Sequence, residues 1–140
     1  MSRSRRIALF CPGCGMQLQA ELWESVNVTV DPDLRERLFR RELNVVHCVT
    51  CDSSVALPVP LLYHDSARRF AVQHVPIDTL ADPRQQLLFT PDGTVECPPS
   101  IAQQYAAFAY LLTPHVVFSN DEMIRYIEFR EALAVCRDDR

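Results

Sequence analysis

The stretch Cys11-Pro12-Gly13-Cys14-Gly15 contains the first of two Cys-x-x-Cys pairs, and Cys48-Val49-Thr50-Cys51 is the second. Proline fixes the direction of the chain into the first turn, and the glycines permit a tight or left-handed backbone. Such a turn lets two sulfur atoms reach one metal ion while adjacent backbone N–H groups stabilise their charge. Because four thiolates suit tetrahedral Zn²⁺, we predict one structural zinc ion, whose ligands are Cys11, Cys14, Cys48 and Cys51.

Residues 15–47 separate the two pairs, which is more than the roughly 15–20 residues of a compact zinc motif. An insertion must therefore fold between them. Residues 17–23 and 26–30 alternate polar and apolar side chains, which predicts two strands with one solvent-facing side. Asp31-Pro32 predicts the start of a short helix, with Leu34 and Leu38 on its buried side.

The second half of the chain reads as further strands and two helices. Residues 55–62 look extended, but Pro58 and Pro60 restrict them to an edge strand or a non-strand. Pro91-Asp92-Gly93 predicts a hairpin turn, because aspartate and glycine meet its dihedral requirements. The further expected elements are a turn at 64–67, a strand at 69–75, hairpin strands at 86–90 and 94–97, and helices after Ser100 and Ser119.

Capping patterns mark the start of both C-terminal helices. Ser100–Gln103 and Ser119–Glu122 have capping-box spacing, and Thr113-Pro114 ends the first helix. We expect Phe118 to pack on Met123 as a hydrophobic staple. The expected apolar positions are Ile101, Tyr105, Phe108 and Leu112 in the first helix, and Met123, Ile127 and Ala134 in the second.

Together these elements predict an α+β fold. A zinc-ribbon-like antiparallel β half with an inserted short helix is followed by a β-hairpin and two C-terminal helices. We expect a single domain at 7–136, with halves at 7–62 and 63–136. Residues 1–6 are expected to form a flexible basic N-terminus.

The sequence resembles the CpXC family, small bacterial proteins named for a Cys-Pro-x-Cys motif. The resemblance rests on Cys11–Cys14, on Trp23 followed by Val26-Asn27, on the second cysteine pair, and on residues 60–65. It implies that Cys11, Cys14, Cys48 and Cys51 are the cysteine set of the family. The family has no assigned activity, so the resemblance predicts a metal site and no reaction.

Composition points to a cytoplasmic protein. No apolar run of the 140 residues approaches the roughly 20 residues of a membrane helix, and Ile7–Phe10 is too short for a signal-peptide core. In a reducing compartment, paired cysteines favour metal over disulfides. The formal net charge of -4 gives no long-range attraction to phosphate backbones, so nucleic acid is not the favoured partner. The 14 basic residues are all arginine, which is typical of GC-rich bacterial genomes.

Other candidate residues have ordinary structural explanations. Tyr63-His64-Asp65, with His115, is the candidate enzyme site, although neighbours on a strand alternate in direction. His47 adjoins Cys48, but four thiolates already complete a tetrahedron. Cys97 and Cys136 lack paired spacing, and their role stays open. The predicted short helix carries four arginines that could contact an anion or a partner: Arg35, Arg37, Arg40 and Arg41. Glu36 and Glu42 are interleaved with them.

These observations favour a zinc-binding, non-enzymatic interaction module whose partner is a protein. A thiol-based redox or metal-responsive switch is the alternative, because cysteine pairs also carry redox chemistry. An enzyme with a site near Tyr63, His64 and Asp65 is the further alternative. The sequence specifies neither the partner nor the oligomeric state.

Overall fold

The computed structural model of the chain describes residues 2–79, 81–87, 89–95 and 106–138. None of the helices in these ranges has the length and apolarity needed to cross a bilayer. The elements, in chain order, are β1 (Arg3–Phe10), β2 (Gln17–Asn27), α1 (Pro32–Phe39), β3 (Val45–His47), β4 (Ser54–Ala56), β5 (Leu61–Asp65), β6 (Phe70–His74), η1 (Ile77–Thr79), α2 (Pro83–Gln86), η2 (Ala106–Leu112), β7 (His115–Val117) and α4 (Asn120–Asp138).

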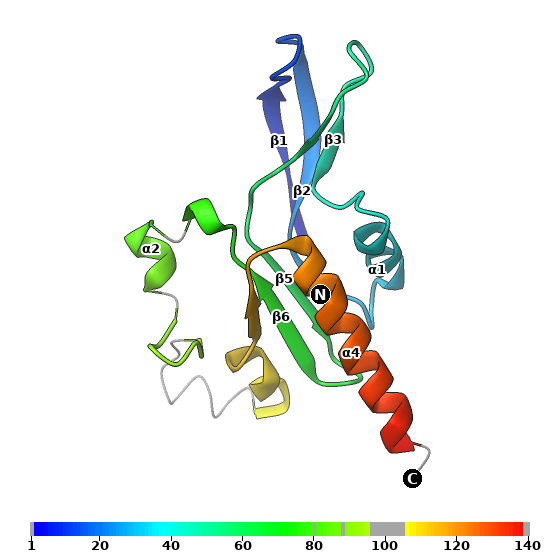
Figure 1. Ribbon diagram of the computed structural model, residues 1–140, viewed down its shortest axis with the longest axis vertical. Helices are drawn as coiled ribbons and strands as arrows, with labels where there is room; N and C mark the ends of the chain where they lie inside the picture. The colour runs from blue at the N-terminus through cyan, green and yellow to red at the C-terminus, as the bar shows by residue number, and fades with distance from the viewer. Residues whose placement is uncertain (1, 80, 88, 96–105, 139–140) are drawn as a thin grey trace.

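A mixed five-stranded sheet, in the order β1-β2-β5-β6-β7, runs through the molecule (Figure 1). β1 and β2 are antiparallel, as are β5 and β6, whereas β2–β5 and β6–β7 are parallel. Tyr63 of β5 is opposite Val26 on one side and Val72 on the other. β3 and β4 form a separate two-stranded hairpin. The predicted α+β class is therefore confirmed. The prediction of an antiparallel β half was wrong in part, because β2 pairs with β5 in parallel.

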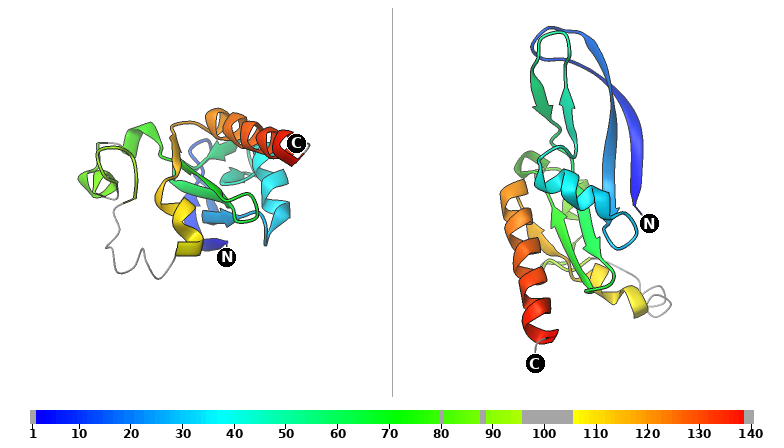
Figure 2. Two further views of the ribbon diagram at one scale, coloured as in Figure 1. Left: turned by 90° about the horizontal axis from the view of Figure 1, so that it is seen from below. Right: turned by 90° about the vertical axis from the view of Figure 1, so that its right-hand side faces the viewer.

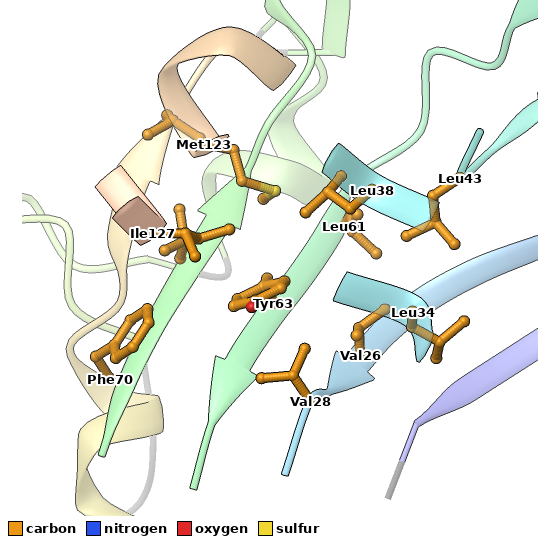
Figure 3. Packing of buried hydrophobic residues seen from close by; sticks show 12 residues of the cluster. Val26, Val28, Leu34, Leu38, Leu43, Leu61, Tyr63, Phe70, Met123 and Ile127 are labelled. Atoms are coloured by element: carbon orange, nitrogen blue, oxygen red, sulfur yellow. The ribbon is translucent and has the colours of Figure 1, made fainter. Parts of the chain in front are cut away.

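Helices α1 and α4 cover the same face of this sheet (Figure 3). Leu34 and Leu38 of α1 and Met123 and Ile127 of α4 pack around the ring of Tyr63. Residues from both predicted halves of the chain thus share one core. The remaining members of the cluster are Val26, Val28, Leu43, Leu61, Phe70, Val72 and Val117.

A single strand, β2, takes the place of the two strands predicted at 17–23 and 26–30. The strand prediction is confirmed for residues 17–23 and 26–27, whereas the predicted break and residues 28–30 were wrong. The chain leaves the sheet only after Asn27, whose side-chain oxygen accepts a hydrogen bond from the N–H of Thr29 at 3.1 Å. Its carbonyl accepts a second bond, from the N–H of Asp31 at 2.9 Å. This asparagine turn ends the strand and leads into α1.

The N-terminus is also more ordered than predicted. β1 pairs with β2 from Arg3↔Ser25 to Phe10↔Gln17. Arg3 and Arg5 both form ion pairs with Glu24, with Nε–O distances of 3.2 and 3.0 Å. Residues 3–6, which we expected to be a flexible basic segment, are therefore part of the sheet.

The predicted hairpin around Pro91-Asp92-Gly93 is reduced to a single bridge, Phe89↔Val95. Its turn is present, since the N–H of Gly93 donates to the carbonyl of Thr90 and Gly93 has φ +86°. However, residues 83–86 form α2, because the Asp82 carboxylate accepts from the Arg84 N–H and Pro83 suits the first helical turn. Cys97, at the end of the predicted second strand, lies outside the described residues.

The turn predicted at 64–67 begins later than expected. His64 and Asp65 belong to β5, and the turn occupies residues 66–69 before β6. The extended stretch at 55–62 is divided between β4 and β5, with Pro58 and Pro60 in the connection. These prolines separate two strands that belong to different sheets.

The C-terminal helices are confirmed in part. Ile101 and Tyr105 of the first predicted helix lie outside the described residues, and its described end, η2, is a 3-10 helix with exposed Phe108. In the second, Ser119 Oγ accepts from the Glu122 N–H at 3.2 Å, as a capping box requires. Met123 and Ile127 are fully buried. Phe118 is exposed, and its N–H donates to the Glu122 carboxylate.

Candidate metal centre

Both Cys-x-x-Cys pairs lie at the tips of hairpins. Cys11–Cys14 is in the connection between β1 and β2, and Cys48–Cys51 is in the connection between β3 and β4. The two hairpins project together from the core (Figure 2). We call residues 3–24 and 45–57 the two-hairpin arm. The four cysteines therefore join two segments that are distant in sequence, at the end of the arm away from the helices (Figures 1 and 2).

The two cysteine turns have the same backbone hydrogen bonds. In the first, the Gly15 N–H donates to the Cys11 carbonyl and the Cys11 N–H donates to the Met16 carbonyl, both at 2.8 Å. In the second, Asp52 donates to Cys48, and Cys48 donates to Ser53, again at 2.8 Å. Gly15 and Asp52 occupy equivalent positions with φ +75° and +58°. Aspartate tolerates this left-handed conformation better than most residues, so the missing second glycine does not prevent the turn.

The four sulfur atoms are arranged as one metal ion would require. All four Sγ atoms lie within 4.8 Å of one another. Cys11 Sγ is 3.5 Å from Cys51 Sγ, and Cys14 Sγ is 3.6 Å from Cys48 Sγ. A tetrahedron with Zn–S bonds of about 2.3 Å has S–S edges of about 3.8 Å. The cysteine cluster therefore fits a tetrahedral ion of this size.

Donors around Cys11 and Cys48 favour their thiolate form. The Ser53 hydroxyl lies 3.6 Å from Cys11 Sγ and 2.9 Å from Cys51 Sγ. The Ser53 hydroxyl and the backbone N–H groups of Cys14 and Gly13 lower the pKa of Cys11 to about 6. In the second turn, the N–H groups of Cys51 and Thr50 lower the pKa of Cys48. At Cys14 the Met16 N–H lowers the pKa, but desolvation and the neighbouring cysteine sulfurs outweigh it and raise the pKa to about 12. Deprotonated thiols are the form that binds metal.

Gly13 lies beside the sulfur cluster, where a Cβ would make ordinary van der Waals contacts. A Cβ at this position would lie 3.4 Å from both Cys51 Sγ and Ser53 Oγ, and 3.7 Å from Cys11 Sγ. Cys11 and Cys48 are buried, whereas Cys14 and Cys51 are exposed. One side of the cluster thus faces solvent, and the other is closed by the two turns.

Asn44 ties the hairpins together at the opposite end of the arm. Its Oδ1 accepts from the Trp23 N–H at 2.7 Å, and its Nδ2 donates to the Trp23 carbonyl at 3.0 Å. Its own carbonyl accepts from the N–H of Leu57, which follows β4. Its φ of 56° is one that asparagine adopts at lower cost than most residues. Asn44 therefore connects the two hairpins at the base of the arm, and the four cysteines meet at its tip.

Replacing Asn44 with alanine is expected to lower the free energy of unfolding of the arm by about 2–3 kcal/mol. About 2 kcal/mol comes from two lost hydrogen bonds, and the rest from the left-handed backbone. Asn44→Gly loses the same bonds but accepts this φ, so it should be about 1 kcal/mol less destabilising. Urea unfolding of both variants measures the difference. If both variants were destabilised equally, the left-handed backbone would make no contribution. If both kept the stability of the wild type, the hydrogen bonds between Asn44 and Trp23 would not stabilise the arm.

The arginines of α1 are partly occupied within the chain. Arg35 forms a two-pronged ion pair with Glu131 of α4, with Nε and Nη2 each 2.8 Å from a carboxylate oxygen. Arg41 pairs with Asp121, and Arg40 Nε donates to the Glu36 carbonyl. Arg37 is half-buried. Arg35 and Arg41 thus connect α1 to α4, and the four predicted arginines do not form one uncompensated anion site.

The histidines and the Tyr63-His64-Asp65 sequence do not form one site. Tyr63 is buried in the core between α1 and α4, whereas His64 faces the opposite side of β5, where its Nδ1 lies 3.1 Å from the Tyr110 hydroxyl. Burial lowers the pKa of His64. His115 stacks on the Tyr126 ring, with centroids 3.9 Å apart. His47 is exposed, and its Nε2 lies 3.0 Å from Asp52 Oδ1.

Two residues that support the cysteine cluster, Ser53 and Asn44, were not predicted from the sequence. Ser53 follows the second cysteine pair closely, and a hydroxyl two residues after Cys51 was the available signal. Asn44 had no signal of its own, because its partner Trp23 is brought to it only by the fold. Cys136, in contrast, is exposed near the end of α4.

Comparison with known proteins places the chain in a family. A family model described as CpXC protein matches residues 9–139. No curated protein and no solved structure gives a significant match. The matched region includes both cysteine turns, the core strands and α4. Because it covers nearly the whole chain, the protein belongs to the CpXC family.

Proposed function

We propose that this protein is a non-enzymatic, protein-binding module of the cytoplasm whose two-hairpin arm is held in shape by one structural zinc ion. The observation that carries the proposal is the cluster of four Sγ atoms within 4.8 Å at the tips of two hairpins. Each hairpin tip contributes two of these sulfur atoms. The ion therefore acts as a cross-link between them, in the manner of a zinc ribbon.

The donor set favours zinc over other common ions. Calcium and magnesium prefer oxygen ligands, whereas thiolates suit zinc, copper(I) and iron. Four thiolates around zinc fill all tetrahedral positions, and catalytic zinc sites keep one position for water or substrate. A filled tetrahedron supports a structural role for Cys11, Cys14, Cys48 and Cys51.

Native mass spectrometry of the chain purified without chelator tests the metal. We expect one zinc ion per chain in the wild type and none in Cys11→Ser. Cys136→Ser is the matched control, because Cys136 is exposed and distant in sequence from both turns. A wild-type chain with no metal, or with iron in place of zinc, would refute the proposed ion.

A thiol switch is the second candidate, and the exposure of Cys14 and Cys51 supports it. Hydrogen peroxide would oxidise two thiolates to one disulfide, and with two protons the peroxide would be reduced to two water molecules. The loss of two thiolate ligands would release zinc. Cys11 and Cys51, with sulfurs 3.5 Å apart, are a suitable pair. Zinc retained at equimolar peroxide, with an unchanged far-UV circular dichroism spectrum, would reject the switch and leave the structural role.

A further inference from the structure

The C-terminal half of α4 extends beyond the turn between β5 and β6 (Figures 1 and 2). A groove of about 740 Å³ lies between this part of the helix and the turn. We call it the α4 groove, and its principal lining residues are Arg68, Tyr126, Phe129, Arg130, Leu133 and Arg137. It lies apart from the cysteine cluster, which is at the other end of the molecule.

The groove combines apolar surface with positive charge. Phe129 is 55% exposed and Leu133 is 37% exposed, although both are large apolar residues. The lining holds three guanidinium groups and one carboxylate, that of Asp138. This excess of positive charge contrasts with the formal net charge of -4 of the whole chain.

Two of the three arginines are available to a ligand. Arg68 is already bound to Asp65, with Nη1 2.8 Å from Oδ2. Arg130 donates to the Tyr126 hydroxyl at 3.1 Å and lies 4.9 Å from the centre of the Phe70 ring. Within the described part of the chain, neither Arg130 nor Arg137 has an acidic group within ion-pairing distance. The rings hold Arg130 in place without neutralising it.

The size of the groove limits its occupant. From Tyr126 to Arg137 the helix rises about 17 Å, which matches roughly five residues of extended peptide. A long polyanion such as nucleic acid would extend beyond the groove and meet the negative field of the rest of the chain. A short segment contacts only the positive region.

We propose that the α4 groove binds a short acidic peptide segment of a partner protein, with carboxylates facing Arg130 and Arg137 and an apolar side chain against Phe129 and Leu133. This inference deepens the proposed binding function and rests on it. Charge complementarity carries it: carboxylates supply the missing partners of the two guanidinium groups. The apolar anchor would cover the exposed side chains of the same groove.

The test is selection of a random seven-residue peptide library against the full chain, followed by fluorescence anisotropy with the selected synthetic peptides. We expect peptides rich in Asp and Glu with one aliphatic or aromatic residue. Arg137→Glu should weaken their binding about tenfold, and 0.5 M NaCl should weaken it as well. Arg137 is exposed and forms no hydrogen bond or ion pair with any other described residue, so this variant should remain folded. Leu133→Ser tests the anchor in the same way.

Arg125→Glu is the matched control, because Arg125 is exposed on α4 and does not line the groove. It should bind the peptides as the wild type does. Selection of no peptide, of peptides without acids, or of peptides insensitive to Arg137→Glu would overturn the proposal. Tighter, Arg137-dependent binding of a thymidine 12-mer would overturn it in favour of nucleic acid. If the chain purified without chelator held no zinc and still bound acidic peptides through Arg137, the zinc proposal alone would fail and the groove proposal would stand.

Discussion

Cys48→Ser is expected to unfold the two-hairpin arm while the core stays folded. The buried side chains of the arm are few, and Trp23 is its one residue that packs against the core cluster around Tyr63. Structural zinc contributes about 10–16 kcal/mol to small zinc peptides, so its loss removes much of what holds the arm. A local loss of about 3 kcal/mol already corresponds to roughly a hundredfold faster amide exchange.

Hydrogen–deuterium exchange measures this effect by region. The N–H groups of Cys11, Gly15, Cys48 and Asp52, which are bonded within the turns, should lose their protection in Cys48→Ser. Amides of β5 and β6 should keep it, because their pairing and the helices above them are unaffected. Chelation of the wild type should give the same pattern, and Cys136→Ser should change nothing. If amides of β5 and β6 lost as much protection as those of the cysteine turns, the prediction that the arm unfolds independently of the core would be wrong.

Asp65→Asn is expected to lower the free energy of unfolding by about 3 kcal/mol at pH 7, because a buried carboxylate loses its charge-assisted hydrogen bonds, including the bond to the exposed Arg68 guanidinium. Asp65 is 2% exposed and accepts bonds from the Arg68 N–H, the Arg68 guanidinium and the Thr29 hydroxyl, at 2.9, 2.8 and 3.2 Å. Burial by itself raises the pKa of the Asp65 carboxyl. The bonds from Arg68 and Thr29 outweigh burial, so the net shift of the pKa is downward.

This shift sets the pH dependence of the effect. A carboxyl whose pKa is lower in the folded state stabilises the protein above its unfolded pKa of about 3.9 and loses that contribution as the pH falls through the folded value. The difference between wild type and Asp65→Asn should therefore shrink below about pH 4. Urea unfolding at pH 7 and pH 3 measures it. Glu128→Gln, an exposed change on α4, is the control, and an equal difference at both pH values would refute this origin.

The candidate site could be predicted from the sequence because its information is local. Two Cys-x-x-Cys turns are short motifs, and each needs only its own residues to orient two sulfur atoms. The sequence could not show that Asn44 supports the site, because its partner Trp23 is 21 residues away in the chain. Ser53 had a local signal in its position two residues after Cys51, but its contact with Cys11, 42 residues away, had none.

The fold was predicted where periodicity was strong and mispredicted where two local signals competed. Helix α1 follows from Pro32 and the spacing of Leu34 and Leu38. At residues 86–90, the extended pattern competed with the helix start at Asp82-Pro83, and the helix prevailed at 83–86. The parallel pairing of β2 with β5 depends on long-range packing and has no short-range signal.

Strand β2 gives the arm the properties of a lever. Its eleven residues span about 36 Å, yet only Ser25, Val26 and Asn27 pair with β5. A tilt of about 5° at Ser25 therefore displaces the cysteine turns by roughly 2 Å, since eight residues lie beyond that pivot. Asn44 joins the hairpins at the base, and the proposed zinc ion would join them at the cysteines, so such a tilt would move them as one body. A force applied at the tip would therefore act on Asn27, where the chain turns toward α1. Two residues later, the Thr29 hydroxyl donates a hydrogen bond to Asp65.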